Sequence, residues 1–184
     1  MDNKVKVAIA GVTSAVAFMM VPTATLAAEA SLDAAVYSAY DWRGQVLNDE
    51  AVLQPSIDVS SDNGLTVNVW GNFDLTDSVG DSEEFSEVDI TVSYDLDLGE
   101  NALGAQIGLI EYLFPKEDDV ADADTREIFV GLSETVGEFD LSLTAYLDID
   151  EVDGAYINAA VEHALSVGEE IGLVAGASVA FATS

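Results

Sequence analysis

The sequence predicts an all-β protein, an antiparallel up-and-down transmembrane β-barrel of about 8–10 strands or more, preceded by a helical signal peptide. Three observations predict it. Apolar and polar residues alternate over long stretches, short and long connectors alternate along the chain, and 49% hydrophobic content coexists with 35 acidic residues. A period of two indicates a strand with one apolar and one polar face.

The N-terminus has the organisation of a secretory signal. Two lysines precede an uncharged apolar run at 7–21, which leads through small residues to an Ala-x-Ala site at 28–30. The run is shorter than a usual transmembrane helix and ends in a cleavage signal. We therefore expect 1–30 to be a signal peptide and 31–184 to be one outer-membrane barrel domain.

The clearest strand covers residues 87–98. Its even-numbered positions, from Val88 to Leu98, are apolar, and its odd-numbered positions are polar. About twelve residues at about 3.3 Å each, tilted about 45°, rise roughly 28 Å, which is enough to cross the apolar band of an outer membrane.

Eight further segments have strand character, so nine strands are expected. In chain order the nine lie at 32–42, 51–60, 65–74, 87–98, 102–112, 125–133, 139–148, 155–163 and 171–181. Nine is odd, whereas single-chain bacterial barrels usually have an even number of strands. Either one strand lacks the pattern or the chain is incomplete at its C-terminal end.

The connectors fall into two classes that alternate. The short ones lie at 61–64, 99–101, 134–138 and 166–170, and the first contains Asn-Gly, a strong hairpin signal. The acidic and often longer ones lie at 43–50, 75–86, 113–124 and 149–154. This is the connectivity of an outer-membrane barrel, in which short turns face the periplasm and long loops face outward.

Aromatic residues gather near the acidic-loop ends of the predicted strands, where we expect an interfacial belt. The candidates are Tyr40, Trp42, Trp70, Phe73, Tyr112, Phe114, Phe129, Tyr146 and Tyr156. The alternative is that aromatic residues simply favour strands. A soluble β-sandwich would also alternate, with its apolar face inward, but long strands and two connector classes favour the barrel.

Charge excludes one class of partner. The chain carries 35 acidic residues against 5 basic ones, and a net charge of −30 does not bind nucleic acid, which requires clustered Lys and Arg. After residue 30 only Arg43, Lys116 and Arg126 remain as bases. No cysteine is present, so packing and sheet closure must hold the fold. No cofactor motif is found.

Three segments resemble a known family. Residues 40–45 read Tyr-Asp-Trp-Arg-Gly-Gln, 53–55 read Leu-Gln-Pro, and 64–72 read Gly-Leu-Thr-Val-Asn-Val-Trp-Gly-Asn. These resemble the TorF-type porin family of outer-membrane proteins. The resemblance implies a small barrel porin and covers about the first third of the exported chain. The acidic loops and the scarcity of bases depart from it.

Acidic side chains on the polar face predict a cation-preferring lumen, because carboxylates lower the energy of cations in a water-filled pore. The alternative is a solvated acidic face inside a plugged or narrow barrel. An arginine at the mouth would either set a constriction with lumen acids or pair with a loop carboxylate at the rim. The pore-lining candidates are Arg43, Asp41, Glu87, Asp89, Asp95 and Asp97.

Acidic loops offer oxygen ligands to divalent cations, although a solvated acidic surface is the simpler interpretation and no defined metal site is predicted. The loop acids are Asp74, Asp77, Asp81, Glu83, Glu84, Glu117, Asp118, Asp119, Asp122 and Asp124. Residues 148–154 resemble a calcium loop but miss its spacing. His163 is the only histidine, beside Glu162 and near Ser166, and we expect no enzyme.

The expected function is therefore an outer-membrane, porin-like channel for passive passage of ions or small polar solutes, with membrane lipid as its partner. The alternative is a non-conducting structural or surface-binding barrel whose acidic loops bind cations. Neither the solute nor the oligomeric state follows from the sequence.

Overall fold

The computed structural model describes residues 7–8, 28–76, 84–99, 103–115, 124–151, 154–167 and 171–183. Every regular element in these ranges is a strand. The strands are β1 (Val7–Ala8), β2 (Ala28–Tyr37), β3 (Tyr40–Trp42), β4 (Gln45–Asn48), β5 (Val52–Ser61), β6 (Leu65–Asp74), β7 (Glu84–Leu96), β8 (Gly104–Leu113), β9 (Thr125–Val136), β10 (Phe139–Asp148), β11 (Ala155–Val167) and β12 (Ile171–Thr183).

The expected signal peptide falls mostly outside the described residues. Within the described part, no helix is long and apolar enough to cross a membrane. Of the apolar run at 7–21, only β1 is described, and it pairs with Phe181 and Ala180 of β12. Strand β2 begins at Ala28, three residues before the expected start of the exported chain.

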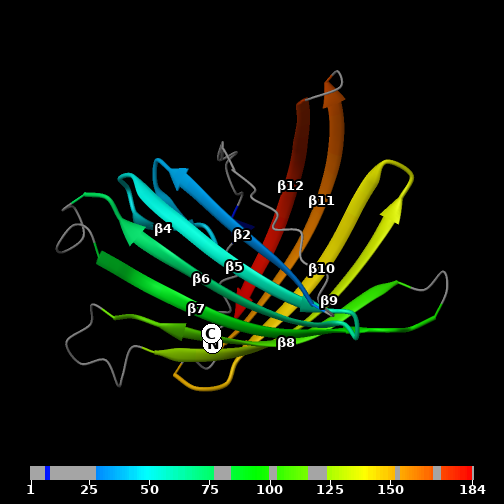
Figure 1. Ribbon diagram of the computed structural model, residues 1–184, viewed down its shortest axis with the longest axis horizontal. Helices are drawn as coiled ribbons and strands as arrows, with labels where there is room; N and C mark the ends of the chain where they lie inside the picture. The colour runs from blue at the N-terminus through cyan, green and yellow to red at the C-terminus, as the bar shows by residue number, and fades with distance from the viewer. Residues whose placement is uncertain are drawn as a thin grey trace.

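Ten strands form one antiparallel sheet in the order β1-β12-β11-β10-β9-β8-β7-β6-β5-β2, and β3 pairs with β4 separately. From β5 to β12, each strand pairs with its neighbours in sequence, which is an up-and-down meander. Figure 1 shows the sheet strongly curled, with β2 and β5 at one end of the series and β11 and β12 at the other. Among the described residues neither β1 nor β12 pairs with β2, so these pairings form an open series.

The nine predicted strands correspond to β2 and β5 to β12. For example, the prediction of 65–74 matches β6, and that of 139–148 matches β10. One prediction is wrong in its extent. The segment 32–42 is not one strand, because β2 ends at Tyr37, the chain bends at residues 38–39, and β3 starts a separate hairpin.

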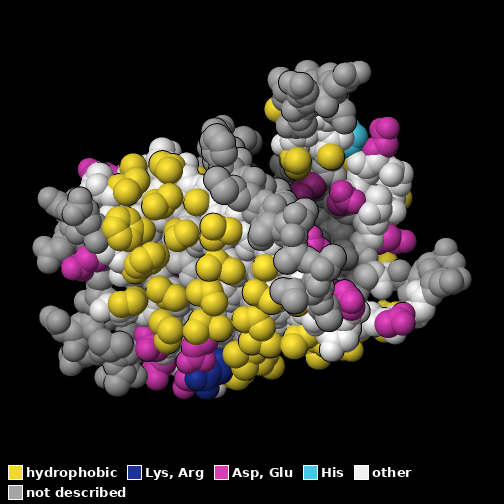
Figure 2. Space-filling view, in the orientation of Figure 1, with side chains coloured by type: hydrophobic (Ala, Val, Ile, Leu, Met, Phe, Trp, Pro, Cys, Tyr) yellow, Lys and Arg dark blue, Asp and Glu magenta, His cyan; other side chains and the backbone are white. Residues whose placement is uncertain are grey.

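The strand register assigns every side chain to one of two faces, because directly paired residues point to the same side of a sheet. Val92 of β7 pairs with Val67 and with Leu109, and this apolar face is uncovered. Ile90 is 37% exposed, Val92 40% and Leu143 46%. We call this side the outer face. Figure 2 shows its apolar side chains as one continuous area over β5 to β7, with acidic side chains at its edges.

The opposite side, the inner face, is polar and partly buried. Six polar or charged residues are buried among the described ones: Asn48, Asn72, Asp74, Glu87, Ser93 and Glu127. The alternation of β7 therefore has the reverse orientation of a soluble core, with carboxylates and hydroxyls inside and aliphatic side chains outside. This distribution positions the candidate site, which lies inside the curl.

Candidate functional site

A hairpin made of β3 and β4 folds over the inner face. Trp42 pairs with Gln45, and the two residues between them, Arg43 and Gly44, have φ angles of 52° and 79°. Two consecutive positive φ angles define a type I′ turn, for which Asn-Gly is the preferred sequence. An arginine in the left-handed region costs about 1 kcal/mol. The Asp41 carboxylate accepts a 3.1 Å hydrogen bond from the Gly44 amide and steadies the turn.

The base of the hairpin is fixed to two wall strands. The Tyr40 hydroxyl donates a 2.8 Å hydrogen bond to Glu87 of β7, and the Tyr40 ring lies 5.7 Å from that of Trp70. On the other hairpin strand, the Asn48 amide donates to Asp74 of β6 at 2.9 Å. Burial, followed by the charge of Glu87, raises the pKa of Tyr40, so this phenol stays protonated and donates.

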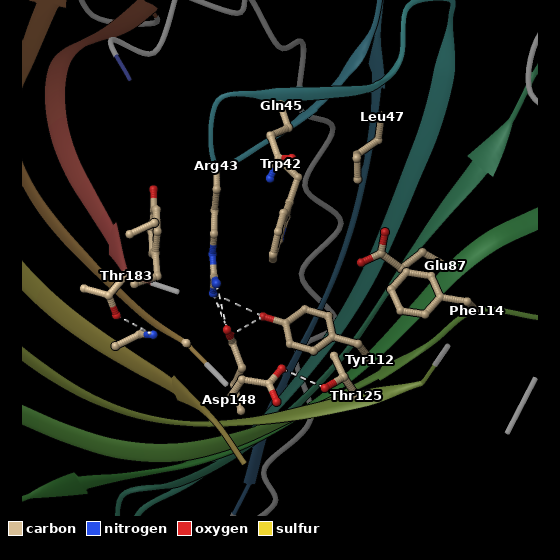
Figure 3. Close-up of a pocket in the computed structure, with 15 residues that line it drawn as sticks. Trp42, Arg43, Gln45, Leu47, Glu87, Tyr112, Phe114, Thr125, Asp148 and Thr183 are labelled. Carbon is tan, nitrogen blue, oxygen red and sulfur yellow. Dashed lines mark hydrogen bonds and ion pairs between the residues drawn. The ribbon is translucent and has the colours of Figure 1, made fainter. Parts of the chain in front are cut away.

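Arg43 at the hairpin tip reaches across the interior to the opposite wall. Its guanidinium donates to both oxygens of Glu127 of β9, at 2.7 and 2.6 Å. Tyr112 of β8 donates to the same carboxylate at 2.8 Å. Figure 3 shows Arg43 descending from the hairpin toward Tyr112. A two-pronged arginine–carboxylate pair of this kind fixes orientation as well as charge.

Aromatic rings surround the same guanidinium. Its central carbon lies 4.4 Å from the ring centre of Trp42, 4.6 Å from that of Tyr146 and 4.3 Å from that of Tyr156. We call the set Trp42, Tyr112, Glu127, Tyr146 and Tyr156 the guanidinium cage. Burial lowers the pKa of Arg43, but the hydrogen bond and charge of Glu127 outweigh it and leave that pKa above its usual value. The tip is therefore a permanent cation.

One close approach supports the cage from below. A Cβ atom built on Gly108 would lie 2.4 Å from the Phe129 ring, so only glycine lets this ring lie flat across β8. Phe129 is buried and packs 5.6 Å from Tyr146. The position of Tyr146 in the cage thus depends on a packed neighbour and not only on Arg43.

A cavity of about 490 Å³ lies beside the hairpin (Figure 3). Aromatic rings, carboxylates and hydroxyls share its wall, which includes Arg43, Glu87, Tyr112, Glu127, Asp148 and Tyr156. Thr125 donates to Asp148 at 2.7 Å on the far side of the cavity. The walls therefore combine ring faces with negative charge, which suits a small cation or polar solute.

The acids predicted to line a pore lie in two places. Glu87 and Asp89 follow each other on the inner face near the hairpin base, and one oxygen of Asp89 is buried without a hydrogen-bond partner in the described part of the chain. Asp95 lies on the inner face at the short-turn end, exposed, and accepts from Gln106 at 2.9 Å. Asp97 accepts from the Gly99 amide in the turn that follows β7.

The sequence predicts Arg43 at the mouth of the lumen, just after a strand at 32–42. Because β2 ends at Tyr37 and a separate hairpin follows, Arg43 is instead held at the tip of a turn. Its partner is the strand carboxylate Glu127 on the inner face, not a loop carboxylate at the rim.

Most residues of the predicted aromatic belt lie inside the curl and not on the outer face. Tyr40, Trp42 and Tyr112 belong to the hairpin contacts, and Tyr146 belongs to the cage. By strand register, Trp70 pairs with Asp89 on the inner face, Phe129 and Tyr156 are also inner, and Phe73 pairs with Phe85 on the outer face. Of these residues only Phe73 faces outward, where a lipid-facing belt must lie.

Sequence reasoning missed Glu127 altogether. Nothing in the strand pattern marks it among 35 acidic residues. One signal was available: Arg43 is among only three bases after residue 30, and a buried lone cation requires a carboxylate partner. The hairpin that brings Arg43 to Glu127 has no strong turn dipeptide, so the contact could not be located.

The remaining candidates lie apart from the cage. Most of the loop acids considered for cation binding fall outside the described residues, and within the described ranges no group of three potential metal ligands is found. Asp74 and Asp124 are used as hydrogen-bond acceptors by Asn48 and the Phe114 amide. His163 packs on Phe139 of the outer face, at the short-turn end of β10.

Comparison with known proteins gives one match. Residues 22–179, most of the chain, match the model of a family described as bacterial protein of unknown function (Gcw_chp). No curated protein and no solved structure matches.

Proposed function

We propose that this chain, which belongs to the Gcw_chp family of bacterial proteins of unknown function, is an exported outer-membrane β-barrel of the TorF-type porin kind. Its lumen passes small cations and small polar solutes by diffusion, and the hairpin of β3 and β4 constricts it. No chemical step is part of this function.

The observation that carries the proposal is the inverted distribution of side chains. Ile90, Val92 and Leu143 lie uncovered on the outer face, while Glu87 and Glu127 are buried inside. In water this arrangement would expose a large apolar area and place charges in the core, which both cost free energy. In a bilayer the same outer face meets hydrocarbon, and the inner face meets enclosed water.

Closure of the sheet is part of the proposal. Because the meander from β2 to β12 holds nine strands, β2 and β12 run in the same direction. They would close the barrel either by a parallel contact or through a further strand between them. In hydrocarbon an open edge leaves its amide and carbonyl groups without partners, so the membrane strongly favours closure.

Cation preference follows from the charges of the inner face. Glu87, Asp89, Asp95 and Asp140 lie on it by register, whereas Arg43 is the only base on it among the described residues and is paired with Glu127. Arg126, by contrast, pairs with Glu111 on the outer face, near the ends of β8 and β9. A pore wall with this excess of carboxylates attracts cations and repels anions.

A second function is favoured by the hairpin itself. Its tip and base are tied to β6, β7 and β9, and a barrel of about nine strands has a narrow interior that side chains nearly fill. A non-conducting surface barrel would have this construction. The two functions differ in one measurable property, ionic conductance.

The test is single-channel recording after refolding into planar bilayers, with a potassium chloride gradient across the membrane. The proposal predicts discrete current steps and a reversal potential with the same sign as the potassium equilibrium potential. The double substitution Asp95→Asn and Asp140→Asn should move the reversal potential toward zero, since both acids lie at the open end of the inner face. Absence of steps favours the surface barrel, and chloride preference contradicts the selectivity proposal.

A further inference from the structure

We infer that the inner wall of the guanidinium cage is a binding site for small molecules that carry a guanidinium group, and that Arg43 occupies it as an internal competitor. This goes beyond the proposed passage of solutes, because binding to the site does not require conductance and is measured without it.

The contacts of Arg43 show which chemistry the wall recognises. Glu127 accepts two parallel N–H donors, Tyr112 holds the carboxylate from the side, and Tyr146 and Tyr156 offer their ring faces at 4.6 and 4.3 Å. A planar cation with a fork of donors satisfies all of these groups together, whereas an ammonium is a point charge that cannot. The wall is thus specific for guanidinium over ammonium.

The wall is supplied by strands and the competitor by a turn. Tyr112, Glu127, Tyr146 and Tyr156 lie on β8 to β11, which pair continuously, and Phe129 packs beneath Tyr146. Arg43 reaches them from a separate two-stranded hairpin. The sheet therefore fixes the backbone of the wall independently of the hairpin, which is what a binding site requires.

The cavity gives a ligand access to this wall. Arg43, Tyr112, Glu127 and Tyr156 all border the space of about 490 Å³, so a small cation in the cavity lies next to the pair that it would displace. The Arg43 side chain is 14% exposed. The turn also strains the backbone of Arg43, since this residue occupies a left-handed position that asparagine would fill better.

The first experiment uses the chain refolded in detergent micelles and titrated with methylguanidinium chloride. Arg43→Asn removes the competitor and suits the type I′ turn. The fluorescence of Trp42, one of two tryptophans in the chain, reports occupancy of the cage. We expect saturable binding to Arg43→Asn with a dissociation constant on the order of 1 mM, and binding to the wild-type chain about tenfold weaker.

Two controls assign the site. Adding Glu127→Gln to Arg43→Asn should weaken binding about tenfold, because it removes the charge that faces the guanidinium. Tetramethylammonium, which has no N–H donors, should bind the Arg43→Asn variant about tenfold more weakly than methylguanidinium. No saturable binding, equal affinity for both cations, or equal affinity with and without the Glu127 carboxylate overturns the inference.

A second measurement uses the wild-type chain alone, so it does not depend on a variant folding. Chymotrypsin cleaves after aromatic residues such as Trp42, and we expect cleavage at this bond to speed up when the hairpin tip leaves the cage. Methylguanidinium should accelerate this cleavage about fivefold relative to sodium chloride at equal ionic strength. Unchanged cleavage overturns the competition between ligand and Arg43. If the chain binds methylguanidinium in micelles but gives no conductance in bilayers, this inference stands and the proposed channel function fails.

Discussion

The two ends of the inner face differ in what fills them. At the end where the acidic loops leave the sheet, Asn72, Asp74 and Glu87 are buried, as is Tyr40 at the base of the hairpin. At the end of the short turns, the inner residues Asp95, Ser133 and Asp140 are exposed. The same alternating strands run through both ends, so the difference comes from the hairpin and not from the sheet.

One short segment therefore determines how much of the interior is filled. A meander of about nine strands leaves room for side chains and little more, and an added two-stranded hairpin fills that room at one end. Its polar anchors, Tyr40 on Glu87 and Arg43 on Glu127, also satisfy carboxylates that burial would otherwise destabilise.

Removing the hairpin should produce the largest effect. Tyr40 and Asn48 are paired across it, so residues 41–47 can be replaced by Asn-Gly without changing the strands on either side. We expect single-channel conductance to rise roughly threefold or more, because the narrowest part of the lumen widens. The control Glu138→Ser, at the short-turn end, should leave conductance unchanged. Equal conductance with and without the tip would mean that the hairpin is not the constriction.

The second largest expected effect is a difference in stability between substitutions on the two faces of one strand. Leu143 of β10 is on the outer face, and its neighbour Ser142 is on the inner face. In lipid vesicles, Leu143→Arg should reduce the free energy of unfolding by about 2–4 kcal/mol, because it places a charge in hydrocarbon, while Ser142→Arg should cost much less. Urea unfolding measures both. If both faces met water, neither exposed position would respond strongly.

The smallest effect concerns a single hydroxyl. Tyr40→Phe removes the hydrogen bond to Glu87 and should reduce the free energy of unfolding by about 1 kcal/mol. Tyr94→Phe is the matched control, because Tyr94 is 42% exposed on the outer face. A loss at position 94 as large as that at position 40 would show that the hairpin anchor contributes nothing particular.

Strands β2 and β5 to β12 could be predicted because each one carries its own signal. Alternation over ten or more residues locates a strand without knowledge of its neighbours, and β6 and β10 were predicted with their observed bounds. Alternation also predicts which residues share a face, as for Leu65, Val67 and Val69, whose partners on β7 are Tyr94, Val92 and Ile90.

The hairpin and the cage could not be predicted because they depend on contacts far apart in the chain. Val36, Tyr40 and Trp42 keep apolar residues at even-numbered positions on both sides of the bend, so the pattern resumes in phase and only Ser38 interrupts it. Arg43 and Glu127 are 84 positions apart, and their contact depends on how the sheet curls. Aromatic residues near strand ends are equally compatible with either face, which is why the belt was assigned to the wrong side for Tyr112 and Tyr146.

The most direct test of an apolar face in lipid and a polar face in enclosed water is a spin-label scan of β10. The chain has no cysteine, so single cysteines at 141, 142, 143 and 144 can each carry a label in vesicles without competing sites. Collision with oxygen, which concentrates in hydrocarbon, should be high at 141 and 143, and collision with a water-soluble nickel chelate should be high at 142 and 144. Labels at 141 and 143 that contact the nickel chelate, or neither reagent, would contradict the placement of the apolar face in lipid.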